Sequence, residues 1–530
     1  MKNNNNLLLT IAIVFGFLFF WDKFVVSRYA PPQRSQARTA PISLGGPAKL
    51  EPMSETSASS GKESEVTLTA PGVSVVIDSL GAGVRSWVIQ ERNHEVELIK
   101  PGAPGSALSL ATFPDLNFDL VSQENGRAVF AANTPQGFRV EKTLQLLSAP
   151  PFHSMSIAIK NITESPLTVE TDIGWIGGLD KHIVGEAVVP KQESAVKMEM
   201  RAVAYGDQVR SFRPGALFSR TLDLDVPGSY LWAGVDNNHF LAALISENSS
   251  LAGLKVRASR STTPQIETPF SKTLQPGEQI AENFLLYVGP KKYTDLQKLP
   301  YHLDASVDFG VFGVISKALL RALESFHRLT GNYGWSIILL TICIQLLVFP
   351  LTKKSLQHSI KMKELQPQLK ALQAQFKKDP KRLQIETLNL YKKNGMKLMG
   401  MEGCLPILLQ MPIFFALYAT MRVAYELRGA PWIFWIKDLG AKDPYYVLPV
   451  VMGAGMFVQQ KVTNVAVDPT QAKMMMFMPI MFTFMFLQFP AGLVLYWVVS
   501  SLTSLTIQRM LTVHLNRQKI ISSRLPNFIP

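Results

Sequence analysis

Five apolar runs in the second half of the chain constrain its fold more than any other feature. They cover roughly 333–352, 404–421, 445–461, 474–489 and 491–508. An apolar helix of this kind pairs all its backbone groups internally, so it can cross a bilayer. The last two runs are split at Phe489-Pro490-Ala491-Gly492, which indicates a tight turn rather than one long helix. The sequence therefore predicts a five-helix membrane core.

Residues 64–303 have a different pattern, in which apolar and polar residues alternate with a period of two. Runs of this kind occur at 66–70, 73–77, 138–146, 154–159, 167–173, 230–235 and 284–288. Turn-forming residues such as Asp236-Asn237-Asn238 separate them. Many short alternating strands with such breaks are typical of a large antiparallel β-sandwich. The chain has only two cysteines, Cys343 and Cys404, both in apolar runs, so this domain can have no disulfide of its own.

The first 63 residues contain an apolar stretch and a linker. Residues 7–21 are apolar, and Phe24-Val25-Val26 extend the stretch to a length that can span a membrane. We expect residues 1–29 to form an uncleaved transmembrane anchor, with a cleaved signal peptide as the alternative. Residues 30–63 are rich in Pro, Ser, Ala and Gly, which is typical of a flexible linker.

An amphipathic helix is predicted between the sandwich and the first core helix, within residues 304–330. Lys317, Arg321, Glu324 and Arg328 fall on one helical face, and apolar side chains lie largely opposite. Such a helix either lies in the headgroup layer of the membrane or packs on the sandwich. The five-helix core then occupies 331–510, and a basic tail occupies 511–530.

The distribution of charge predicts the orientation in the membrane. Between Lys353 and Glu402 there are twelve Lys or Arg and four Asp or Glu, whereas the 422–444 loop is nearly balanced. Basic loops stay in the cytoplasm, so residues 353–402 and the C-terminal tail are predicted to be cytoplasmic. Residues 30–330 are then periplasmic, and the N-terminal anchor places the N-terminus in the cytoplasm.

Residues 353–402 are predicted to form a helical hairpin with its break at Lys378-Asp379-Pro380. Its basic side chains, with those of the tail, are candidates for docking on anionic lipid or ribosomal RNA. The alternative is a solvated face that only fixes topology. The candidates are Lys353, Lys354, Lys361, Lys363, Lys377, Lys378, Arg517 and Lys519.

Polar residues recur inside the apolar runs. Thr341 and Gln345 lie one helical turn apart in the first core helix. Others follow in later helices: Gln410, Thr483, Gln488, Ser500, Thr503 and Ser504. Residues of this kind either join helices by hydrogen bonds or together line a water-filled cavity.

No catalytic or metal-binding motif is visible: the chain has no P-loop, no H-E-x-x-H and no G-x-S-x-G. We therefore expect no enzyme activity, no cofactor and no metal. A secondary transporter would need inverted repeats or midplane charges. A membrane-tethered protein that binds or modifies carbohydrate is a further alternative, with His153, His182 and His239 as candidates that are also explained as structural residues.

Local motifs of the membrane half resemble the YidC/Oxa insertase family, in the form with a large periplasmic domain. The motifs span about 309–517 in the family's order: Phe349-Pro350-Leu351-Thr352, Gly403-Cys404-Leu405-Pro406, Gln410-Met411-Pro412-Ile413-Phe414, Asp443-Pro444-Tyr445-Tyr446, Phe477-Met478-Pro479 and Phe489-Pro490-Ala491-Gly492-Leu493-Val494-Leu495-Tyr496-Trp497. The resemblance implies a bacterial inner-membrane insertase and chaperone for nascent membrane proteins. Its implied partners are the Sec translocon, the ribosome and membrane lipids.

The resemblance also implies a hydrophilic groove and an apolar surface for substrates, called here the slide. The groove would use the polar residues above together with Tyr496 and Trp497. The slide would run along the second and fourth core helices, although core packing explains its residues equally: Leu405, Leu408, Met411, Phe414, Phe415, Met478, Phe482, Met485 and Phe486. The periplasmic sandwich would have a galactose-mutarotase-like fold.

One position departs from the family pattern. Where the family usually has a groove arginine in the first core helix, this chain has Gln345. Glutamine still forms hydrogen bonds but carries no charge. A mechanism in which a fixed cation attracts acidic substrate tails is therefore not expected here.

Overall fold

The computed structural model describes residues 64–524 except 92–93, 100–106, 111–112, 114–115, 148–150, 177–178, 184–199, 213–220, 248–249, 260–263, 378, 396–400 and 464–468. The expected anchor and linker lie outside the described residues. The described chain divides into two compact parts. We call the part up to Val307 the β unit and the part from Asp308 the helical unit.

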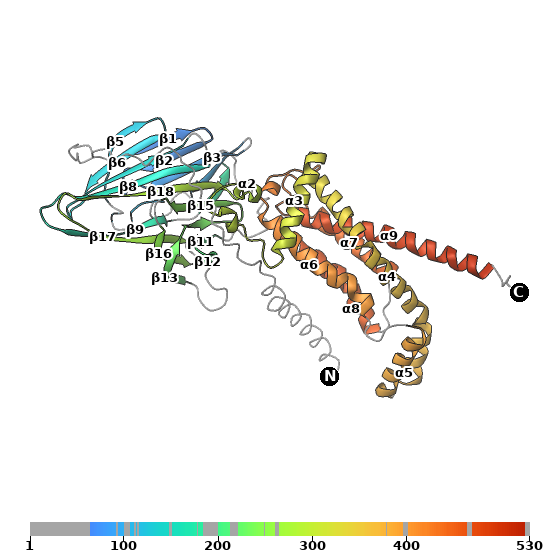
Figure 1. The fold of residues 1–530 in the computed structure, drawn as a ribbon. Helices are drawn as coiled ribbons and strands as arrows, with labels where there is room; N and C mark the ends of the chain where they lie inside the picture. Colours follow the sequence, from blue (N-terminus) through green and yellow to red (C-terminus); the bar gives the residue numbers. More distant parts are fainter. Residues whose placement is uncertain are drawn as a thin grey trace. The chain divides into compact units, whose positions relative to one another are not determined.

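The β unit consists of three antiparallel sheets (Figure 1). The first has the order β1 (Glu65–Ala70), β2 (Val73–Asp78), β3 (Val84–Glu91), β4 (His94–Ile99) and β10 (Leu179–Ile183). The nine-stranded second sheet has the order β12 (Val209–Phe212), β11 (Arg201–Tyr205), β14 (Trp232–Asp236), β15 (Phe240–Ser246), β18 (Gln279–Pro290), β8 (Phe152–Asn161), β7 (Phe138–Gln145), β6 (Arg127–Asn133) and β5 (Asp119–Glu124). The third has the order β13 (Thr221–Tyr230), β16 (Leu251–Ser259), β17 (Gln265–Leu274) and β9 (Leu167–Ile176).

Alternating burial explains how these strands form layers. In β7, Phe138, Val140 and Leu144 are buried, while the residues between them are mostly more exposed, which is the period of a sheet with one face on a core. The central strands β14 and β15 are buried along their whole length, because β9 and β17 pack against them. The all-β sandwich predicted from the period of two is confirmed.

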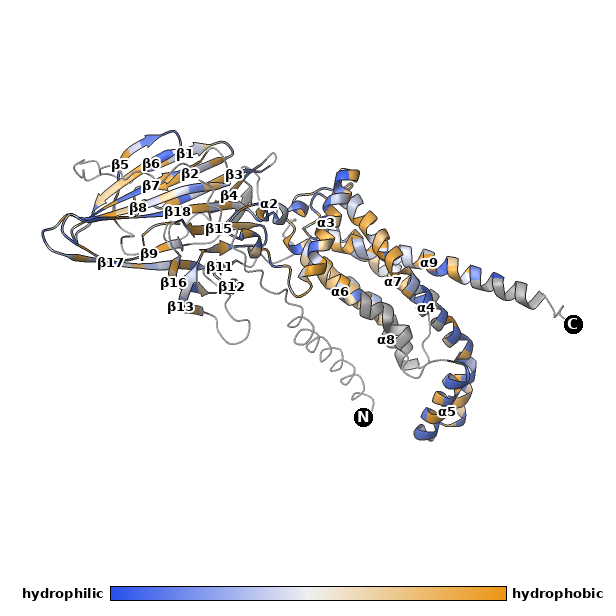
Figure 2. Ribbon diagram, viewed as in Figure 1, coloured by the Kyte–Doolittle hydropathy of each residue, from blue (hydrophilic) through white to orange (hydrophobic). Residues whose placement is uncertain are grey.

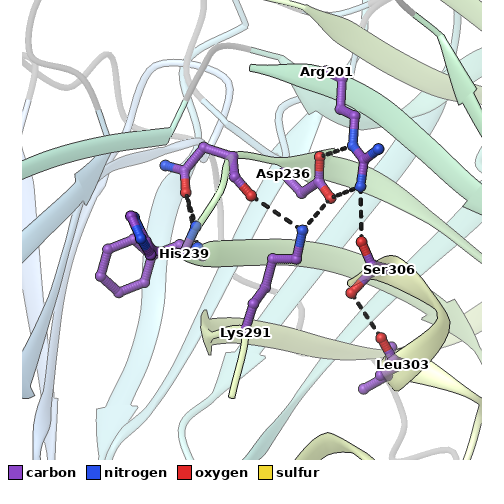
Figure 3. Close-up of polar contacts among 8 residues, drawn as sticks. Arg201, Asp236, His239, Lys291, Leu303 and Ser306 are labelled. Atoms are coloured by element: carbon purple, nitrogen blue, oxygen red, sulfur yellow. Dashed lines mark hydrogen bonds and ion pairs between the residues drawn. The ribbon is translucent and has the colours of Figure 1, made fainter. Parts of the chain in front are cut away.

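A cluster of charged side chains is buried at the end of strand β14 (Figure 3). Asp236, at the end of β14, accepts hydrogen bonds from Arg201 Nε at 2.6 Å and from Lys291 Nζ at 2.6 Å. Arg201 also donates to the backbone oxygen of Ser306 at 2.7 Å. Ser306 lies in η2 (Leu303–Ser306), which follows α2 (Tyr293–Leu296). The cluster therefore fixes the segment after β18 to the sheet.

The helical unit begins with α3, the amphipathic helix. It runs over Gly313–Thr330, so it starts later than the sequence predicts, because the short helix η2 and a bend at Gly310 precede it. Its buried face contacts α4 (Tyr333–Gln375) and α6 (Met401–Val423). Ser316 Oγ donates to the backbone oxygen of Ala416 at 3.0 Å. The buried face of α3 thus packs on neighbouring helices of its own unit.

Helix α4 is longer than predicted. The prediction that the first core helix ends near residue 352 is wrong, because the helix continues through Pro350 and Pro367 to Gln375. A proline removes one backbone hydrogen bond but does not have to end a helix, and the residues that follow favour helix. Helix α5 (Pro380–Lys393) then forms the second arm of the hairpin, and Asp379 caps it by accepting from Arg382 N at 3.1 Å.

In the described part of the helical unit, the short helix η3 (Tyr425–Leu427) and the helices α7 (Val447–Thr463), α8 (Pro469–Phe486) and α9 (Ala491–Arg524) follow. A short turn joins α8 to α9, as the Phe-Pro-Ala-Gly sequence predicts. Within the described residues, α4 and the 491–514 part of α9 are long and apolar enough to cross a membrane, and Met476–Phe486 is a shorter apolar segment. Hydrophobic residues predominate in α7, whereas α5 and the adjoining part of α4 are largely hydrophilic (Figure 2).

Candidate functional site

Two hydrogen-bonded side-chain pairs join three apolar helices. Gln345 Nε2 on α4 donates to Ser500 Oγ on α9. Gln410 Nε2 on α6 donates to the Tyr496 hydroxyl on α9 at 2.7 Å. Tyr496 and Ser500 are one turn apart, so a single face of α9 receives both bonds. We call these four residues the polar layer.

The polar layer lies deep within its helices. At 1.5 Å per residue, Gln345 is about 18 Å along α4 from Tyr333, and Ser500 is about 14 Å along α9 from Ala491. A hydrocarbon core is about 30 Å thick, so both positions are near the middle of a spanning helix. Gln345 is 7% exposed and Tyr496 is fully buried. The layer therefore places paired polar groups where an unpaired one would be costly.

The other predicted groove residues do not join helices in this way. The hydroxyls of Thr341, Thr483 and Thr503 each donate to the carbonyl four residues earlier in their own helix. Thr503 and Ser504 are half-buried one turn after Ser500 on α9. Gln488 is exposed in the turn between α8 and α9.

Trp497 belongs to an aromatic cluster instead of a polar surface. Its ring lies 5.5 Å from Phe414 of α6 and 5.3 Å from Phe486 of α8, measured between centroids. Phe482 lies 6.2 Å from Trp497. Phe486 is fully buried, so its role in the structure is packing and it offers no surface to a substrate. The core-packing interpretation of the slide holds for this residue.

The remaining slide residues differ in exposure. Met478 and Met485 of α8 are 41% and 44% exposed. Met411 and Phe414 are half-buried, and Phe415 is 36% exposed while stacking on Phe312 at 6.2 Å. The side chains of Leu405 and Leu408 lie outside the described residues.

Helix α8 exposes further apolar side chains that are not among the predicted slide residues. They are Met476, Phe477, Ile480, Met481 and Phe484, each more than half exposed. Among the described elements, α8 has its main contacts with α7, so most of its circumference is left open. The sequence indicates this exposure, because the helix is apolar around its whole surface and not along one face.

Asp443 is a buried polar residue outside the predicted groove. It is 1% exposed and accepts hydrogen bonds from Trp435 Nε1 at 3.0 Å, Tyr445 N at 3.1 Å and Leu448 N at 2.7 Å. Leu448 is in the first turn of α7, whose free N–H groups favour an acidic acceptor. Asp443 therefore fixes the loop between α6 and α7 to the start of α7.

The basic candidates lie on the surface of the hairpin and of α9. Lys353, Lys354, Lys361, Lys363 and Lys377 are exposed, as is Arg517. Buried Leu365 and Leu369 pack with Leu390 and Tyr391 of α5, which holds the two arms of the hairpin together. Lys378 and the side chain of Lys519 lie outside the described residues.

Two of the candidate histidines, His153 and His239, have structural surroundings. His153 is 2% exposed, and its Nδ1 accepts from Leu147 N at 3.3 Å. Burial lowers the pKa of His153 to about 4, so it is neutral near pH 7. His239 lies in the β14–β15 turn, where its backbone N donates to Asn237 Oδ1 at 2.8 Å (Figure 3). The side chain of His182 is not described, and within the described residues no group of His, Cys, Asp and Glu is placed to hold a metal.

Comparison with known proteins covers both units. Residues 325–518 match the family described as 60Kd inner membrane protein, and residues 65–322 match the YidC periplasmic domain. A membrane protein insertase YidC from Endomicrobium trichonymphae is 36% identical over 458 residues, which are 84% of this chain and 85% of that protein. Another from Syntrophus aciditrophicus is 31% identical over 549 residues, covering 94% of this chain and 97% of that protein. Among solved structures, an active YidC insertase with its first transmembrane domain resolved matches with a TM-score of 0.38 and 18% identity, covering 84% of this chain and 92% of that one.

Proposed function

Because the chain belongs to the YidC family of membrane protein insertases, we propose that its helical unit moves apolar segments of nascent proteins into lipid past the polar layer. The family and the insertase function predicted from the motifs are confirmed by relatives that match most of the chain. The same relatives support the polytopic helical membrane core with a periplasmic β domain. They give no support to a transporter or to a carbohydrate-modifying protein.

The free energy of insertion explains what a protein of this kind has to do. Burying an apolar helix is favourable by about 0.3 to 0.6 kcal/mol per Leu or Ile. A charged residue flanking that helix costs about 3 kcal/mol or more at the bilayer centre. The barrier is therefore the polar flank of the substrate, and no nucleotide-driven step is needed for the apolar part.

The polar layer is the observation that supports this proposal most strongly. Gln345, Ser500, Gln410 and Tyr496 satisfy one another in the absence of substrate. A substrate flank can take over these hydrogen bonds near the middle of the bilayer, so its polar groups do not lose all their partners at once. Thr341, Thr503 and Ser504 would extend the polar path along α4 and α9. Thr483 on α8 and Gln488 in the turn after α8 would lie at its margin.

The exposed apolar surface of α8 provides the exit into lipid. Met478 and Met485 are exposed together with Phe477, Met481 and Phe484. Methionine side chains are flexible and adapt to many apolar partners. The slide would therefore be formed mainly by α8, with the partly exposed Met411 and Phe415 of α6 beside it.

The groove of this chain acts through polarity and not through charge. Gln345 stands at the position where the family usually has an arginine, and its amide is hydrogen-bonded to Ser500. The side chain therefore brings no cation to attract acidic substrate tails. We expect substrates with acidic and basic flanks to be handled more evenly than a fixed positive charge would allow.

We further propose the inner membrane as the location, with both termini and the hairpin in the cytoplasm. The excess of Lys and Arg between residues 353 and 402 supports this orientation. The exposed lysines of the hairpin would dock on the ribosome or on anionic lipid, and the Sec translocon would be a partner during insertion. No residue is assigned a catalytic role, and no cofactor is assigned.

The function is tested with purified full-length protein in vesicles of phosphatidylethanolamine and phosphatidylglycerol. A radiolabelled single-span substrate is added, and protease protection measures its insertion. We expect protected substrate in these vesicles and little in protein-free vesicles. Equal protection in both, together with failure to support growth of a bacterium depleted of its insertase, would refute the proposal.

A further inference from the structure

The end of the helical unit where α4 begins carries aromatic side chains that point away from the core. Phe434 is 87% exposed, Tyr445 is 69% exposed and Trp335 is 50% exposed. Phe434 stacks on Trp435 with centroids 6.0 Å apart, and Tyr446 is also exposed. We call the four exposed residues Trp335, Phe434, Tyr445 and Tyr446 the aromatic rim, while Trp435 is half-buried beneath Phe434. The polar layer and the slide use none of them.

A rigid frame holds the aromatic rim in place. Trp432 fills the space beside Gly334 so closely that a Cβ there would lie 2.0 Å from its ring. Trp432 also meets Trp335 edge-to-face at 6.2 Å, and Asn332 Nδ2 donates to the Pro431 backbone oxygen at 3.0 Å. The loop between α6 and α7 is therefore fixed to the start of α4.

The same loop is fixed to two other helices. Asp443 bonds Trp435 Nε1 on one side and the start of α7 on the other. The N-terminus of α9 donates from Ala491 N to Ala441 O at 2.7 Å and from Gly492 N to Leu439 O at 2.9 Å. Chain segments from four helices thus converge on one loop. The exposure of the aromatic rim is a property of this frame and not of a loose loop.

The backbone of the rim carries conformational strain. Phe434 and Tyr446 have φ values of +49° and +58°, in the left-handed region that large side chains rarely adopt. Strain of this kind persists only where surrounding contacts impose it. One of the two strained residues, Phe434, is also 87% exposed, and it is unfavourable to expose a phenylalanine ring to water. The combination indicates that the rim is covered in the membrane-embedded protein.

We propose that the aromatic rim inserts into the headgroup layer of the bilayer at the end where α4 begins. Trp335 is about 3 Å along α4 from Tyr333, so it lies at the edge of the apolar run. Tyrosine and tryptophan prefer the boundary between hydrocarbon and headgroups, because they have an apolar ring with a polar group. The rim is also continuous with exposed side chains of α7 such as Val450, which is 59% exposed and faces lipid in a spanning helix. Exposed Lys437 in the same loop suits the phosphate layer.

The rim would set the depth of the helical unit in the bilayer. The apolar runs that contain α7 and α8 cover about 445–461 and 474–489, which is 17 and 16 residues or about 26 and 24 Å, less than the thickness of the hydrocarbon core. If the rim fixes one end of the helical unit at the headgroup layer, the opposite ends of these apolar runs stop short of the other face of the hydrocarbon core. The bilayer is then thinned on the side to which α4 and the hairpin extend.

Spin labels measure this depth directly in the full-length protein. Cys343 and Cys404 are replaced by serine, and nitroxides are placed by Phe434→Cys and, separately, by Tyr445→Cys in phosphatidylethanolamine–phosphatidylglycerol vesicles. Collision with oxygen reports lipid, and collision with a water-soluble nickel chelate reports water. Leu347→Cys, an 81% exposed position within α4, serves as the lipid reference, and Asp379→Cys on the hairpin serves as the water reference.

We expect the oxygen-to-nickel collision ratio at 434 and 445 to be severalfold above that at 379 and to lie below that at 347, as for a position in the headgroup layer. Lys437→Cys, in the same loop, should give a lower ratio than 434. Ratios at 434 and 445 equal to that at 379 would place the rim in water and overturn the proposal. Low collision rates with both reagents would show a protein covering the rim, either a second copy or a partner, and would also overturn it.

Discussion

Gln345 on α4 donates a hydrogen bond to Ser500 on α9 at the middle of two helices that are otherwise mainly apolar. The bond occupies the position where the resemblance to the family leads us to expect an arginine. Together with the bond from Gln410 to Tyr496, it links α4 and α6 to one face of α9. These buried polar groups are thus hydrogen-bonded to one another, which limits their cost to the stability of the fold.

Removing the Asp443 carboxylate should destabilise the helical unit. Asp443→Ala leaves Trp435 Nε1 and two backbone N–H groups without their acceptor, and we expect a loss of about 2 to 3 kcal/mol. Asp443→Asn should lose less, because one oxygen remains. Thermal unfolding in detergent, followed by circular dichroism at the helical band, measures the effect. Exposed Lys437→Ala is the control, and equal melting temperatures for it and Asp443→Ala would contradict the assignment.

Substitutions of different members of the buried charge cluster should lower the free energy of unfolding of the β unit by different amounts. Asp236→Ala removes the carboxylate that buried Arg201 and Lys291 both contact, and we expect a loss of about 3 to 5 kcal/mol. Lys291→Met leaves one cation and one anion paired, so its loss should be smaller. Urea unfolding followed by tryptophan fluorescence gives both values. The reverse order would mean that Asp236 does not hold the cluster together.

Lys142 should make the stability of the β unit depend on pH. Burial lowers its pKa from 10.5 to about 7, while its amine bonds the backbone oxygens of Ala82 and Leu108. The unfolded chain then binds more protons than the folded one between pH 7 and 10.5, so stability should rise with pH in that window. From pH 7 to 9 we expect a gain of about 2 kcal/mol in the free energy of unfolding from this group.

Lys142→Met is the variant that isolates this effect. It should be less stable at high pH, because two buried carbonyl oxygens lose a donor. Its urea midpoint should nevertheless change less between pH 7 and pH 9 than that of the unsubstituted protein. An identical pH dependence in both proteins would show that Lys142 does not titrate in this range.

The orientation can be tested with single cysteines in the background without Cys343 and Cys404. Lys272→Cys lies at an exposed position of β17, and Asp379→Cys lies at the exposed tip of the hairpin. A membrane-impermeant maleimide should label position 272 in cells with a permeabilised outer membrane and should leave 379 unlabelled until the inner membrane is opened. Labelling of position 379 but not of position 272 while the inner membrane is closed would contradict the predicted orientation.

Patterns in the sequence predict which helices and strands this protein forms better than they predict which residues contact one another. The period of two gave the strands of the sandwich, since alternation follows directly from the geometry of a strand. The order of the strands did not follow, because β9 pairs with β17, about a hundred residues away, and no local pattern records such a partner. The end of α4 was also missed, because Pro350 is a frequent helix terminator but is tolerated inside this helix.

In the candidate site, too, the sequence predicts types of residues and helical faces but not contacts. Spacing placed Thr341 and Gln345 on one face of a helix, but it did not show that Gln345 meets Ser500 while Thr341 bonds its own backbone. The apolar slide residues were chosen by type, and burial then separated Phe486, which is in the core, from exposed Met485. Which apolar residue is exposed depends on the neighbours of α8, and those neighbours are set by the tertiary fold.

Insertion of two matched substrates by a Gln345→Leu, Thr341→Val variant tests the role of the polar layer most directly. The substrates share one apolar helix and differ only in whether the translocated flank carries charges, and Leu347→Val, an exposed change on α4, is the control. In reconstituted vesicles we expect insertion of the charged-flank substrate to slow by about tenfold, the effect of 1.4 kcal/mol, while the uncharged substrate is spared. Equal slowing of both substrates, or of neither, would contradict a polar layer that carries charged flanks across the bilayer.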